Sequence, residues 1–509
     1  MHRAVLTPSR LLPLSAVVAG TLLLAPAPGG AQTLPEPLQK KVTAWYRTAA
    51  RYAPGQWGIA IANQDGDMLW SVRPDQPLMP ASTVKLLTTG FARTMLGGEA
   101  RVATRVRGSG HLDEATGEWI GSWSLEMNGD YSLEREDRTG PSLDDLAQQL
   151  AEGGVRKLRG PLQVTSTQGP ADAVYPAAWS RHHWGRLFAP LVGPITLNEN
   201  VVWLTVRPGG RSGARPSLIG TAPSGLDNMV TMHARTVGGF RSHLAVRRMA
   251  DGGFLVTGSI GAHASPRRLM SVSTDPRAVL AETWALSLRR AGIDWDRTAA
   301  AEAGGGAGKP EILAEVNSAP LDSLAKEVNT RSLNIGAELL LEWAAGRADG
   351  PELLTRHVEE VSGVAGGAHL ADGSGLSYED RVTPATFVSY LARFPQTPAG
   401  KNFPMLLPAN GQGTLARLRS GLPGPGVVHA KTGTLGNVST LVGYLGRRDG
   451  VLLISLMYNG GRVMTAKKQQ WKLFRLLGAD GMAIPSDSLY SVEPEQLGGE
   501  DAAPADTTR

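Results

Sequence analysis

Three short stretches of the chain carry side chains that could cooperate in nucleophilic catalysis. In chain order they are Ser82-Thr83-Val84-Lys85, Ser332-Leu333-Asn334 and Lys431-Thr432-Gly433. A hydroxyl and an amine three residues apart lie on one face of a helix, where the amine can accept the proton of the hydroxyl. The first stretch therefore predicts a serine nucleophile, Ser82, with a lysine base, Lys85.

Lys85 can act as a base only while its amine is neutral. The ordinary pKa of a lysine, about 10.4, must then be lowered by burial or by a nearby positive charge. Lys431 could supply that charge. The second stretch falls on a turn between two helix-like segments, where Ser332 could relay the proton to a leaving amine. Asn334 could hold the acyl side of a substrate and orient Lys85.

The third stretch combines a cation, hydroxyl groups and a glycine at a strand edge. Lys431 and the hydroxyls of Thr432 and Thr434 could bind a substrate carboxylate. Gly433 leaves the backbone open to an extended peptide. The N–H groups of Ser82 and Thr434 could form an oxyanion hole, in which the loss of one donor typically costs ~10²–10³ in rate.

A single match to any of these patterns carries little information. Ser323-Leu324-Ala325-Lys326 repeats the first pattern, and a bare Ser-x-Asn is often only a helix cap. The second copy lies nine residues before Ser332, too close to form a separate catalytic helix and return to the cleft. We interpret it as a surface helix.

The surrounding residues predict the elements that position these stretches. Apolar residues at Val84, Leu87, Phe91 and Met95 indicate a helix that begins at Ser82. The other expected elements are a helix over 38–52, a strand hairpin over 58–70, helices over 143–153, 321–328, 335–345 and after 384, strands over 427–430, 438–445 and 451–457, and a final helix. Short strand-like runs and glycine-rich turns between 98 and 318 predict a mainly β insertion.

The spacing of the three stretches resembles one group of penicillin-recognising serine enzymes. Ser332 follows Ser82 by 250 residues, far more than in a compact β-lactamase, and Lys431 follows Ser332 by 99. Over roughly residues 35–480 the chain resembles the class C low-molecular-mass penicillin-binding proteins. These are the D-alanyl-D-alanine carboxypeptidase/endopeptidases of the penicillin-binding protein 4 type, peptidase family S13. Other family-like stretches are Gly129–Leu133, Leu197–Val202, Asp372–Ser377, Gly413–Leu415 and His429–Leu435.

The resemblance implies an α/β (α+β) serine transpeptidase/β-lactamase-like domain, with an antiparallel sheet flanked by helices and a mainly β inserted region in two parts. It implies a serine-type D-alanyl-D-alanine carboxypeptidase/endopeptidase that acts on peptidoglycan stem peptides ending in D-Ala-D-Ala. The acyl-enzyme would form on Ser82, β-lactams would be covalent inhibitors, and no cofactor is implied. The residues that carry over are Ser82, Lys85, Ser332, Asn334 and Lys431 as catalytic, with Thr432, Gly433 and Thr434 as substrate-binding.

The expected domain organisation follows from the same comparison. It comprises a signal peptide (1–31), the first part of the transpeptidase-like domain (32–98), inserted domains (99–317), the second part of that domain (318–484) and an acidic, disordered tail (485–509). The insertion divides into an outer domain, over 99–165 and 275–317, and an inner domain over 166–274.

The chain departs from the family pattern at two places. Leu333 stands where an Asp is common, which leaves Ser332 and Asn334 in place. A family acidic residue expected soon after Gly160 is absent from Val164-Thr165-Ser166-Thr167. The second departure bears on the diamino acid of the substrate, so the preferred crosslink stays open.

The N-terminal residues resemble a secretory signal. Arg3 and Arg10 precede an apolar stretch over 11–24, and cleavage is expected after Ala31. The alternative is an uncleaved anchor, for which the stretch is short. No later segment reaches the ~18 apolar residues of a membrane helix, so we expect a periplasmic protein with at most peripheral membrane contact. The absence of cysteine excludes disulfides, thiolate zinc sites and a lipoprotein anchor.

Charge and motif content exclude several other classes. Residues 32–484 carry 48 Lys and Arg against 40 Asp and Glu, which suits a polyanionic neighbour such as the cell wall. No run of basic residues interleaved with aromatics indicates nucleic acid binding. The chain has no Gly-x-Ser-x-Gly of an α/β-hydrolase and no phosphate loop, and its histidines lack metal-ligand spacing, so no metal is predicted.

Two other functions remain open from the residues alone. Fast deacylation at the same serine would give a β-lactamase or esterase. A surviving site with little turnover would give a wall-binding or regulatory protein. The oligomeric state and the balance of carboxypeptidase and endopeptidase activity are not set by the sequence.

Overall fold

The computed structural model describes residues 33–137, 139–299, 310–418 and 420–485. The expected signal peptide and the acidic tail beyond its first residue lie outside this set. Among the described residues, no helix combines the length and the apolar character needed to cross a membrane.

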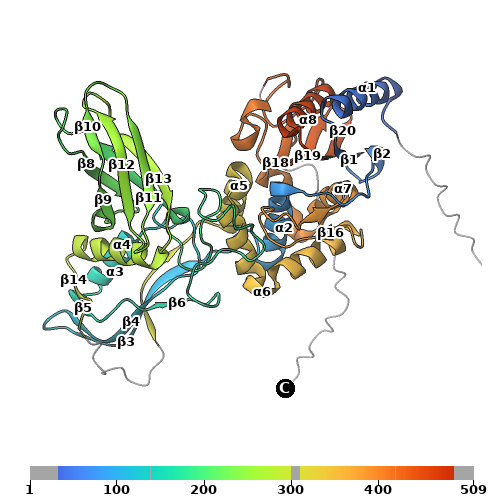
Figure 1. Ribbon diagram of the computed structural model, residues 1–509. Helices are drawn as coiled ribbons and strands as arrows, with labels where there is room; N and C mark the ends of the chain where they lie inside the picture. Colours follow the sequence, from blue (N-terminus) through green and yellow to red (C-terminus); the bar gives the residue numbers. More distant parts are fainter. Residues whose placement is uncertain (1–32, 138, 300–309, 419, 486–509) are drawn as a thin grey trace, which may run out of the picture. The chain divides into compact units, whose positions relative to one another are not determined.

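A five-stranded antiparallel sheet carries the third catalytic stretch (Figure 1). Its strands, in spatial order, are β18 (Val428–Leu435), β19 (Val438–Arg447), β20 (Gly450–Asn459), β1 (Gln56–Ala62) and β2 (Met68–Val72). Because β1 pairs with β20, the sheet joins residues from near both ends of the described chain. The predicted hairpin and the three predicted C-terminal strands are confirmed.

Both faces of this sheet are buried, because alternate side chains along each strand pack into different clusters. Ile59 and Ile61 of β1 join a core cluster with residues of α1 (Glu36–Tyr52) and α8 (Val463–Leu477). Ala60 and Ala62 belong to a second cluster with helices of the opposite layer. Successive strand side chains point to opposite faces, so one helical layer covers each.

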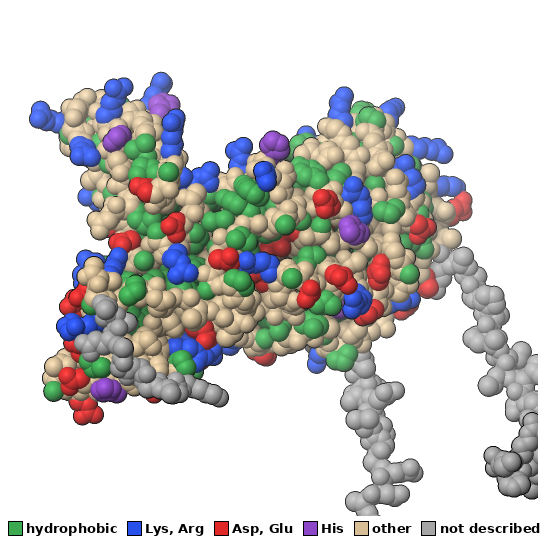
Figure 2. Space-filling view, turned by 60° about the horizontal axis from the view of Figure 1, so that its bottom comes forward, with side chains coloured by type: hydrophobic (Ala, Val, Ile, Leu, Met, Phe, Trp, Pro, Cys, Tyr) green, Lys and Arg blue, Asp and Glu red, His purple; other side chains and the backbone are tan. Residues whose placement is uncertain are grey.

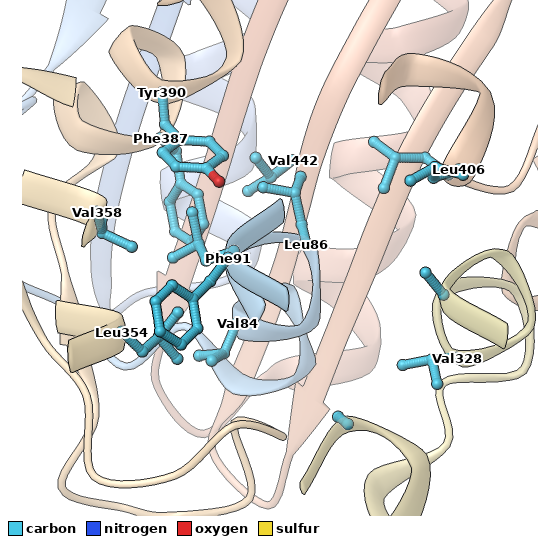
Figure 3. Close-up of a cluster of buried hydrophobic side chains, with 14 of the residues drawn as sticks. Val84, Leu86, Phe91, Val328, Leu354, Val358, Phe387, Tyr390, Leu406 and Val442 are labelled. Carbon is cyan, nitrogen blue, oxygen red and sulfur yellow. The ribbon is translucent and has the colours of Figure 1, made fainter. Parts of the chain in front are cut away.

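The second cluster fixes the helix that follows Ser82. This helix, α2 (Val84–Leu96), packs with α5 (Leu321–Arg331), α6 (Asn334–Ser362) and α7 (Pro384–Arg393). The buried side chains labelled in Figure 3 are Val84, Leu86 and Phe91 of α2, Val328 of α5, Leu354 and Val358 of α6, Phe387 and Tyr390 of α7, Leu406 and Val442. Burial of each such aliphatic or Phe side chain stabilises the fold by about 1.5–3 kcal/mol, so α2 is a rigid support.

Helix α6 is longer than expected. The predicted run over 335–345 is helical, but the helix continues to Ser362 across a kink at Gly346, whose φ is 75°. Pro351 lies within the second segment. The sequence prediction stopped at these residues because glycine and proline usually end a helix.

Between α2 and α5, the described residues of the insertion form three further sheets. A six-stranded sheet is formed by β14 (Asp294–Asp296), β5 (Lys157–Arg159), β4 (Glu118–Glu126), β3 (Ala103–Asp113) and β15 (Glu311–Asn317), with β6 (Val164–Thr165) beside β4. A three-stranded sheet has the order β13 (Arg267–Val272), β7 (Val201–Arg207), β8 (Ser217–Ala222). A four-stranded sheet has the order β10 (Arg235–Val237), β12 (Phe254–Gly261), β11 (His243–Arg248), with β9 (Val230–Met232) beside β12.

Among the described residues of the insertion, two α-helices occur where one was predicted. Helix α3 (Leu143–Glu152) matches the expectation and begins with a capping box between Ser142 and Asp145. Helix α4 (Pro276–Arg290) was missed, although Asp275 caps its start. Its buried residues recur at helical spacing, so the signal was present. The remaining short strands are β16 (Ala368–His369) and β17 (Arg381–Val382).

Candidate active site

Ser82 lies at the start of α2, as predicted. It is the middle residue of a 3₁₀ turn, Ala81–Thr83, that leads directly into the helix at Val84. Ser82 is half-buried, whereas Lys85, one turn further, is fully buried. The Nζ atom of Lys85 lies 3.2 Å from the Oγ atom of Ser82. The predicted nucleophile and its predicted base are therefore within hydrogen-bonding distance of each other.

Two further acceptors hold the amine of Lys85. Its Nζ donates to Oδ1 of Asn334 at 2.5 Å and to the carbonyl oxygen of Ser374 at 2.6 Å. A neutral amine has two N–H groups and one lone pair. With both N–H groups bound to these acceptors, the lone pair faces the hydroxyl of Ser82. In its neutral form the amine could therefore accept the proton of the serine hydroxyl.

Burial also favours the neutral amine. It lowers the pKa of Lys85 to about 8, against the opposing influence of carboxyl groups at Asp372, Glu338 and Asp380. Burial and the charge of Asp372 in turn raise the pKa of Glu338 to about 8. The pKa of Asp380 is raised well above its ordinary value for the same reasons. The raised pKa of Glu338 and of Asp380 favours the neutral form of each carboxyl, which weakens the opposing negative charge behind Lys85.

Asp372 shapes the loop that supplies the Ser374 carbonyl. Its carboxylate accepts four backbone N–H groups, those of residues 374–377, at 2.5–3.0 Å. Gly375 has φ +74°, and a Cβ there would lie 2.0 Å from the carbonyl oxygen of Ala81. The loop therefore packs directly against the backbone of the nucleophile. The sequence singled out this stretch but gave it no role.

Ser332 lies on the turn between α5 and α6, as expected. It follows the last residue of α5 in the left-handed conformation, with φ 61° and ψ 46°. Its Oγ accepts a hydrogen bond from Nζ of Lys431 at 2.9 Å. With one lone pair of Ser332 engaged in this way, its own O–H remains free to donate. Asn334 opens α6 and uses Nδ2 to donate to the carbonyl of Phe188 at 2.7 Å.

The insertion contacts the helix that ends at Ser332. Arg135 forms a bidentate ion pair with Glu327 of α5, with both hydrogen bonds at 2.7 Å. Glu199 binds Arg331 through two hydrogen bonds of 2.6 and 3.0 Å. Arg331 directly precedes Ser332. The insertion thus holds the turn from which Ser332 projects.

Glu199 is held in an uncommon backbone conformation. Asn198, Glu199 and Asn200 have φ values of 46°, 60° and 53°. Asn tolerates this left-handed region, whereas Glu rarely occupies it. The side-chain amides of the two Asn residues donate to nearby backbone carbonyls at 2.8 and 3.0 Å. They stabilise the conformation that presents Glu199 to Arg331.

The third stretch lies on β18 beside Ser332. Lys431 and Thr432 are buried, and Lys431 also donates to the carbonyl of Thr432 at 2.9 Å. Burial lowers the pKa of Lys431 well below its ordinary value, and the charges of Lys85 and Lys467 lower it further. Gly433 fits closely, because a Cβ there would lie 2.6 Å from the carbonyl oxygen of Pro80.

Thr434 is exposed at the end of this stretch, next to a basic residue that the sequence did not indicate. Nζ of Lys467, on α8, lies 3.4 Å from the Thr434 hydroxyl. Lys467 and Arg417 both line a small cavity of about 240 Å³. No motif spacing marks Lys467, because α8 carries several lysines at helical intervals. The arrangement places positive charge where an anionic group could bind.

A larger cavity, of about 600 Å³, lies where the insertion meets the turn at Ser332. Its walls include Ser332 and Asn334 from the catalytic turn and Leu187, Phe188 and Trp203 from the insertion. It is the space into which a substrate longer than the reacting bond could extend.

Comparison with known families identifies the family of the chain. The model of the D-Ala-D-Ala carboxypeptidase 3 (S13) family matches residues 39–476. The chain belongs to this family. The S13 resemblance, the serine-type carboxypeptidase class and the fold class predicted from the sequence are thereby confirmed.

Individual S13 relatives and solved structures agree with that assignment. The D-alanyl-D-alanine carboxypeptidase of Actinomadura sp. (strain R39) is 27% identical over 442 residues, 79% of this chain and 77% of that protein. A carboxypeptidase of Mycobacterium tuberculosis is 27% identical over 403 residues, 76% and 72% of the two chains. Penicillin binding protein 4 of Haemophilus influenzae has a similar fold, with a TM-score of 0.67 at 20% identity, over 84% of this chain and 99% of that one. The same protein solved with a β-lactam gives a TM-score of 0.63.

The remaining sequence interpretations can be placed on this S13 fold. Ser323 and Lys326 of the repeated pattern are exposed on α5. Leu333 is half-buried and packs against the core cluster around α2. Where an acidic residue was expected, the hydroxyls of Ser166 and Thr167 bind Oδ1 of Asn128 at 3.1 and 3.0 Å. This stretch therefore supplies no charge to a ligand.

Proposed function

We propose that Ser82 is the nucleophile of a D-alanyl-D-alanine carboxypeptidase that acts on peptidoglycan stem peptides. The observation that carries this role is the amine of Lys85, whose two N–H groups bind Asn334 and Ser374 while the Ser82 hydroxyl lies 3.2 Å away. As the bond from Oγ to the substrate carbonyl carbon forms, Nζ of Lys85 takes the hydroxyl proton.

The proton then has to reach the leaving amine. We assign its transfer to Ser332, whose Oγ is held by Lys431 at 2.9 Å and whose O–H is free to donate. As the C–N bond breaks, the nitrogen gains the proton and D-Ala departs, leaving an ester on Ser82. Lys85 then takes a proton from a water molecule, whose oxygen attacks the ester carbonyl carbon. As the ester C–O bond breaks, this proton passes from Lys85 to Oγ of Ser82 and the shortened peptide leaves.

The substrate carboxylate would bind beside β18. The basic side chains there are Lys431 and Lys467, with hydroxyls at Thr432 and Thr434. The backbone N–H groups of Ser82 and Thr434 are assigned to the oxyanion hole. The activity named for the Actinomadura relative and the β-lactam in the Haemophilus structure support a D-Ala-D-Ala substrate and acylation by β-lactams.

The location and domain division belong to the same proposal. A periplasmic enzyme would meet this substrate, and the N-terminal sequence suits export. The inserted domains, 99–317, would interrupt a catalytic domain formed by 32–98 and 318–484. The pairing of β15 with β3 agrees with this, because it brings the two ends of the insertion side by side.

Covalent labelling tests the nucleophile directly. Purified protein should become covalently labelled by a fluorescent penicillin, and Ser82→Ala should not. Ser323→Ala is the matched control, because it removes the same hydroxyl from the repeated pattern on the exposed face of α5. Labelling of Ser82→Ala at the rate of the unmodified protein would refute the assignment. Release of D-Ala from a diacyl-D-Ala-D-Ala peptide then distinguishes a carboxypeptidase from a β-lactamase, which would hydrolyse the penicillin instead.

A further inference from the structure

The positive charge of the chain is concentrated in one segment of the insertion. Residues 201–272, which form β7 to β13, contain nine arginines, no lysine and only two acidic residues, Asp227 and Asp251. All nine arginines are exposed. In the rest of the chain, acidic residues outnumber Lys and Arg by 44 to 42. The net positive charge of +5 therefore comes from this segment.

A hydrophobic core holds this segment in shape. Val202, Leu204 and Val206 of β7 pack with Phe254 and Val256 of β12, all buried. Successive side chains along a strand point to opposite faces, so the residues that alternate with these buried ones face outward. Among the described residues, Arg268 forms an ion pair with Glu136, and no carboxylate pairs with the other eight arginines. These side chains have charge available for a partner outside the chain.

Six of the arginines are carried by three loops and strand ends that backbone hydrogen bonds tie together. The β7–β8 loop is bound to β10, because the N–H of Gly213 donates to the carbonyl of Thr236 at 3.0 Å and that of Thr236 to Ala214 at 3.2 Å. The β12–β13 turn is bound to the β10–β11 loop, because the N–H of His263 donates to the carbonyl of Gly239 at 3.1 Å. We call this end the arginine tip; its arginines are Arg207, Arg211, Arg215, Arg235, Arg241 and Arg267.

The arginine tip also carries an exposed aromatic side chain. Phe240, beside Arg241, is 71% exposed, and its ring centroid lies 5.4 Å from that of His263. Figure 2 shows basic side chains around the end of the region at the upper left, with acidic side chains only nearer its base. A group of arginines around one projecting aromatic ring fits the interface of a lipid bilayer, where phosphates lie above the acyl chains.

We propose that the arginine tip docks the protein onto an anionic phospholipid surface. The guanidinium groups of the tip would bind lipid phosphates, for which their planar, two-pronged donors are well suited. The ring of Phe240 would enter the boundary between headgroups and acyl chains. A membrane is favoured over a soluble polyanion because a polymer of phosphates would gain nothing from an exposed phenyl ring. This inference is independent of the catalytic roles proposed above.

Vesicle binding tests the docking surface. The protein should sediment with vesicles of phosphatidylglycerol and phosphatidylcholine at a ratio of about 1:2, but not with phosphatidylcholine alone. The triple variant Arg211→Gln, Arg215→Gln, Arg241→Gln should bind about 100-fold more weakly. The control is Lys41→Gln, Arg47→Gln, Arg51→Gln, which removes the same charge from exposed positions on α1 and should bind almost as well as the unmodified protein.

Phe240→Ser separates lipid insertion from charge. It should reduce mainly the binding that persists at about 0.5 M salt, where charge interactions are screened. Equal weakening by the two triple variants would overturn the proposal, since net charge alone would then explain binding. So would a failure to bind the anionic vesicles, or binding to soluble polyphosphate without binding to vesicles. Penicillin labelling of every variant reports separately on folding and on the proposed catalytic site.

Discussion

The amine of Lys85 has only three hydrogen-bonding positions, and two of them are occupied by fixed acceptors. The carbonyl of Ser374 and Oδ1 of Asn334 do not change with protonation, so only the contact with Ser82 differs between the two forms of the amine. Loss of one proton thus converts the group facing Ser82 from a donor into an acceptor.

The rate of acylation should therefore follow the neutral fraction of Lys85. Because burial lowers the pKa of Lys85 to about 8, the rate constant for penicillin acylation should rise about tenfold per pH unit below that value and level off above it. Lys85→Arg should remain unlabelled throughout, since arginine stays protonated. The measurement is the labelling rate between about pH 6 and pH 10. A rate that is constant from pH 6 to pH 9 would contradict the role of Lys85.

The candidate site residues could be predicted from spacing, whereas most of the groups that support them could not. Ser82, Lys85 and Ser332 are recognisable because they occur in a fixed order near predicted helix boundaries. Glu338 could have been noticed, since it follows Asn334 by one helical turn. The Ser374 carbonyl could not, because any residue supplies a backbone oxygen and only the folded loop aims it at Lys85.

Among the elements, α5 positions the turn that carries Ser332. It is contacted by the insertion along one side and ends at Ser332. Arg331 is held by Glu199, a residue more than a hundred positions earlier whose strained backbone is stabilised by its neighbours. Strain of this kind persists where the surrounding structure imposes it, often at functional sites.

Loss of the Glu199 carboxylate should impair the proton transfer assigned to Ser332. We expect Glu199→Gln to lower kcat for an amide substrate about 10- to 100-fold, because the turn before Ser332 loses its support. A thioester substrate should be affected much less, since its leaving thiolate needs no proton. The measurement is kcat and KM for both substrates, together with the melting temperature.

A matched ion pair provides the control. Glu282→Gln breaks the ion pair with Arg297. The side chains of Glu282 and Arg297 are 24% and 40% exposed, which is close to the 17% and 42% of Glu199 and Arg331. Either substitution should change stability by about 0–1 kcal/mol. If the two variants lose amide hydrolysis equally, or if Glu199→Gln slows both substrates alike, Glu199 has no positioning role.

Elements with strong local signals were predicted well and those with weak signals were not. The helix after Ser82 and the C-terminal strands have clear periodicity and turns. The predicted helix stopped before Gly346, whereas α6 continues beyond it. Tertiary packing overrides the local preference of glycine, and this packing was not visible in the sequence. The pairing of β1 with β20 could not be foreseen either, since no local signal relates residues 56–62 to residues 453–459.

At the scale of the molecule, the buried side chains of the described residues form four hydrophobic clusters. Two cover the faces of the five-stranded sheet, one belongs to the six-stranded sheet and one to strands β7–β13. Cooperative unfolding follows shared buried contacts, so clusters with few common residues can unfold at different temperatures. The sequence predicted an insertion in two parts, but not which side chains form each core.

Substitutions in different clusters should therefore have different consequences. Phe254→Ala and Phe387→Ala each remove a fully buried ring and should each cost about 3–5 kcal/mol. Phe254→Ala should lower the temperature of one calorimetric transition, that of the β7–β13 cluster. Between this temperature and the transition temperature of the five-stranded sheet, penicillin labelling should remain intact. Phe387→Ala should abolish labelling in that temperature range. A single transition shifted equally by both substitutions would contradict separate unfolding.

The shape of the loop held by Asp372 does not depend on most of the side chains that the loop carries. Its four hydrogen bonds go to backbone N–H groups, so they survive any substitution at 374, 376 or 377 that fits the space and keeps the N–H. Proline, which has no N–H, is excluded there. The side chains at these positions can thus change, by design or by natural selection, while the backbone carbonyl at 374 remains in place to bind Lys85. Asp372 itself, like Gly375, is the position that such variation cannot touch.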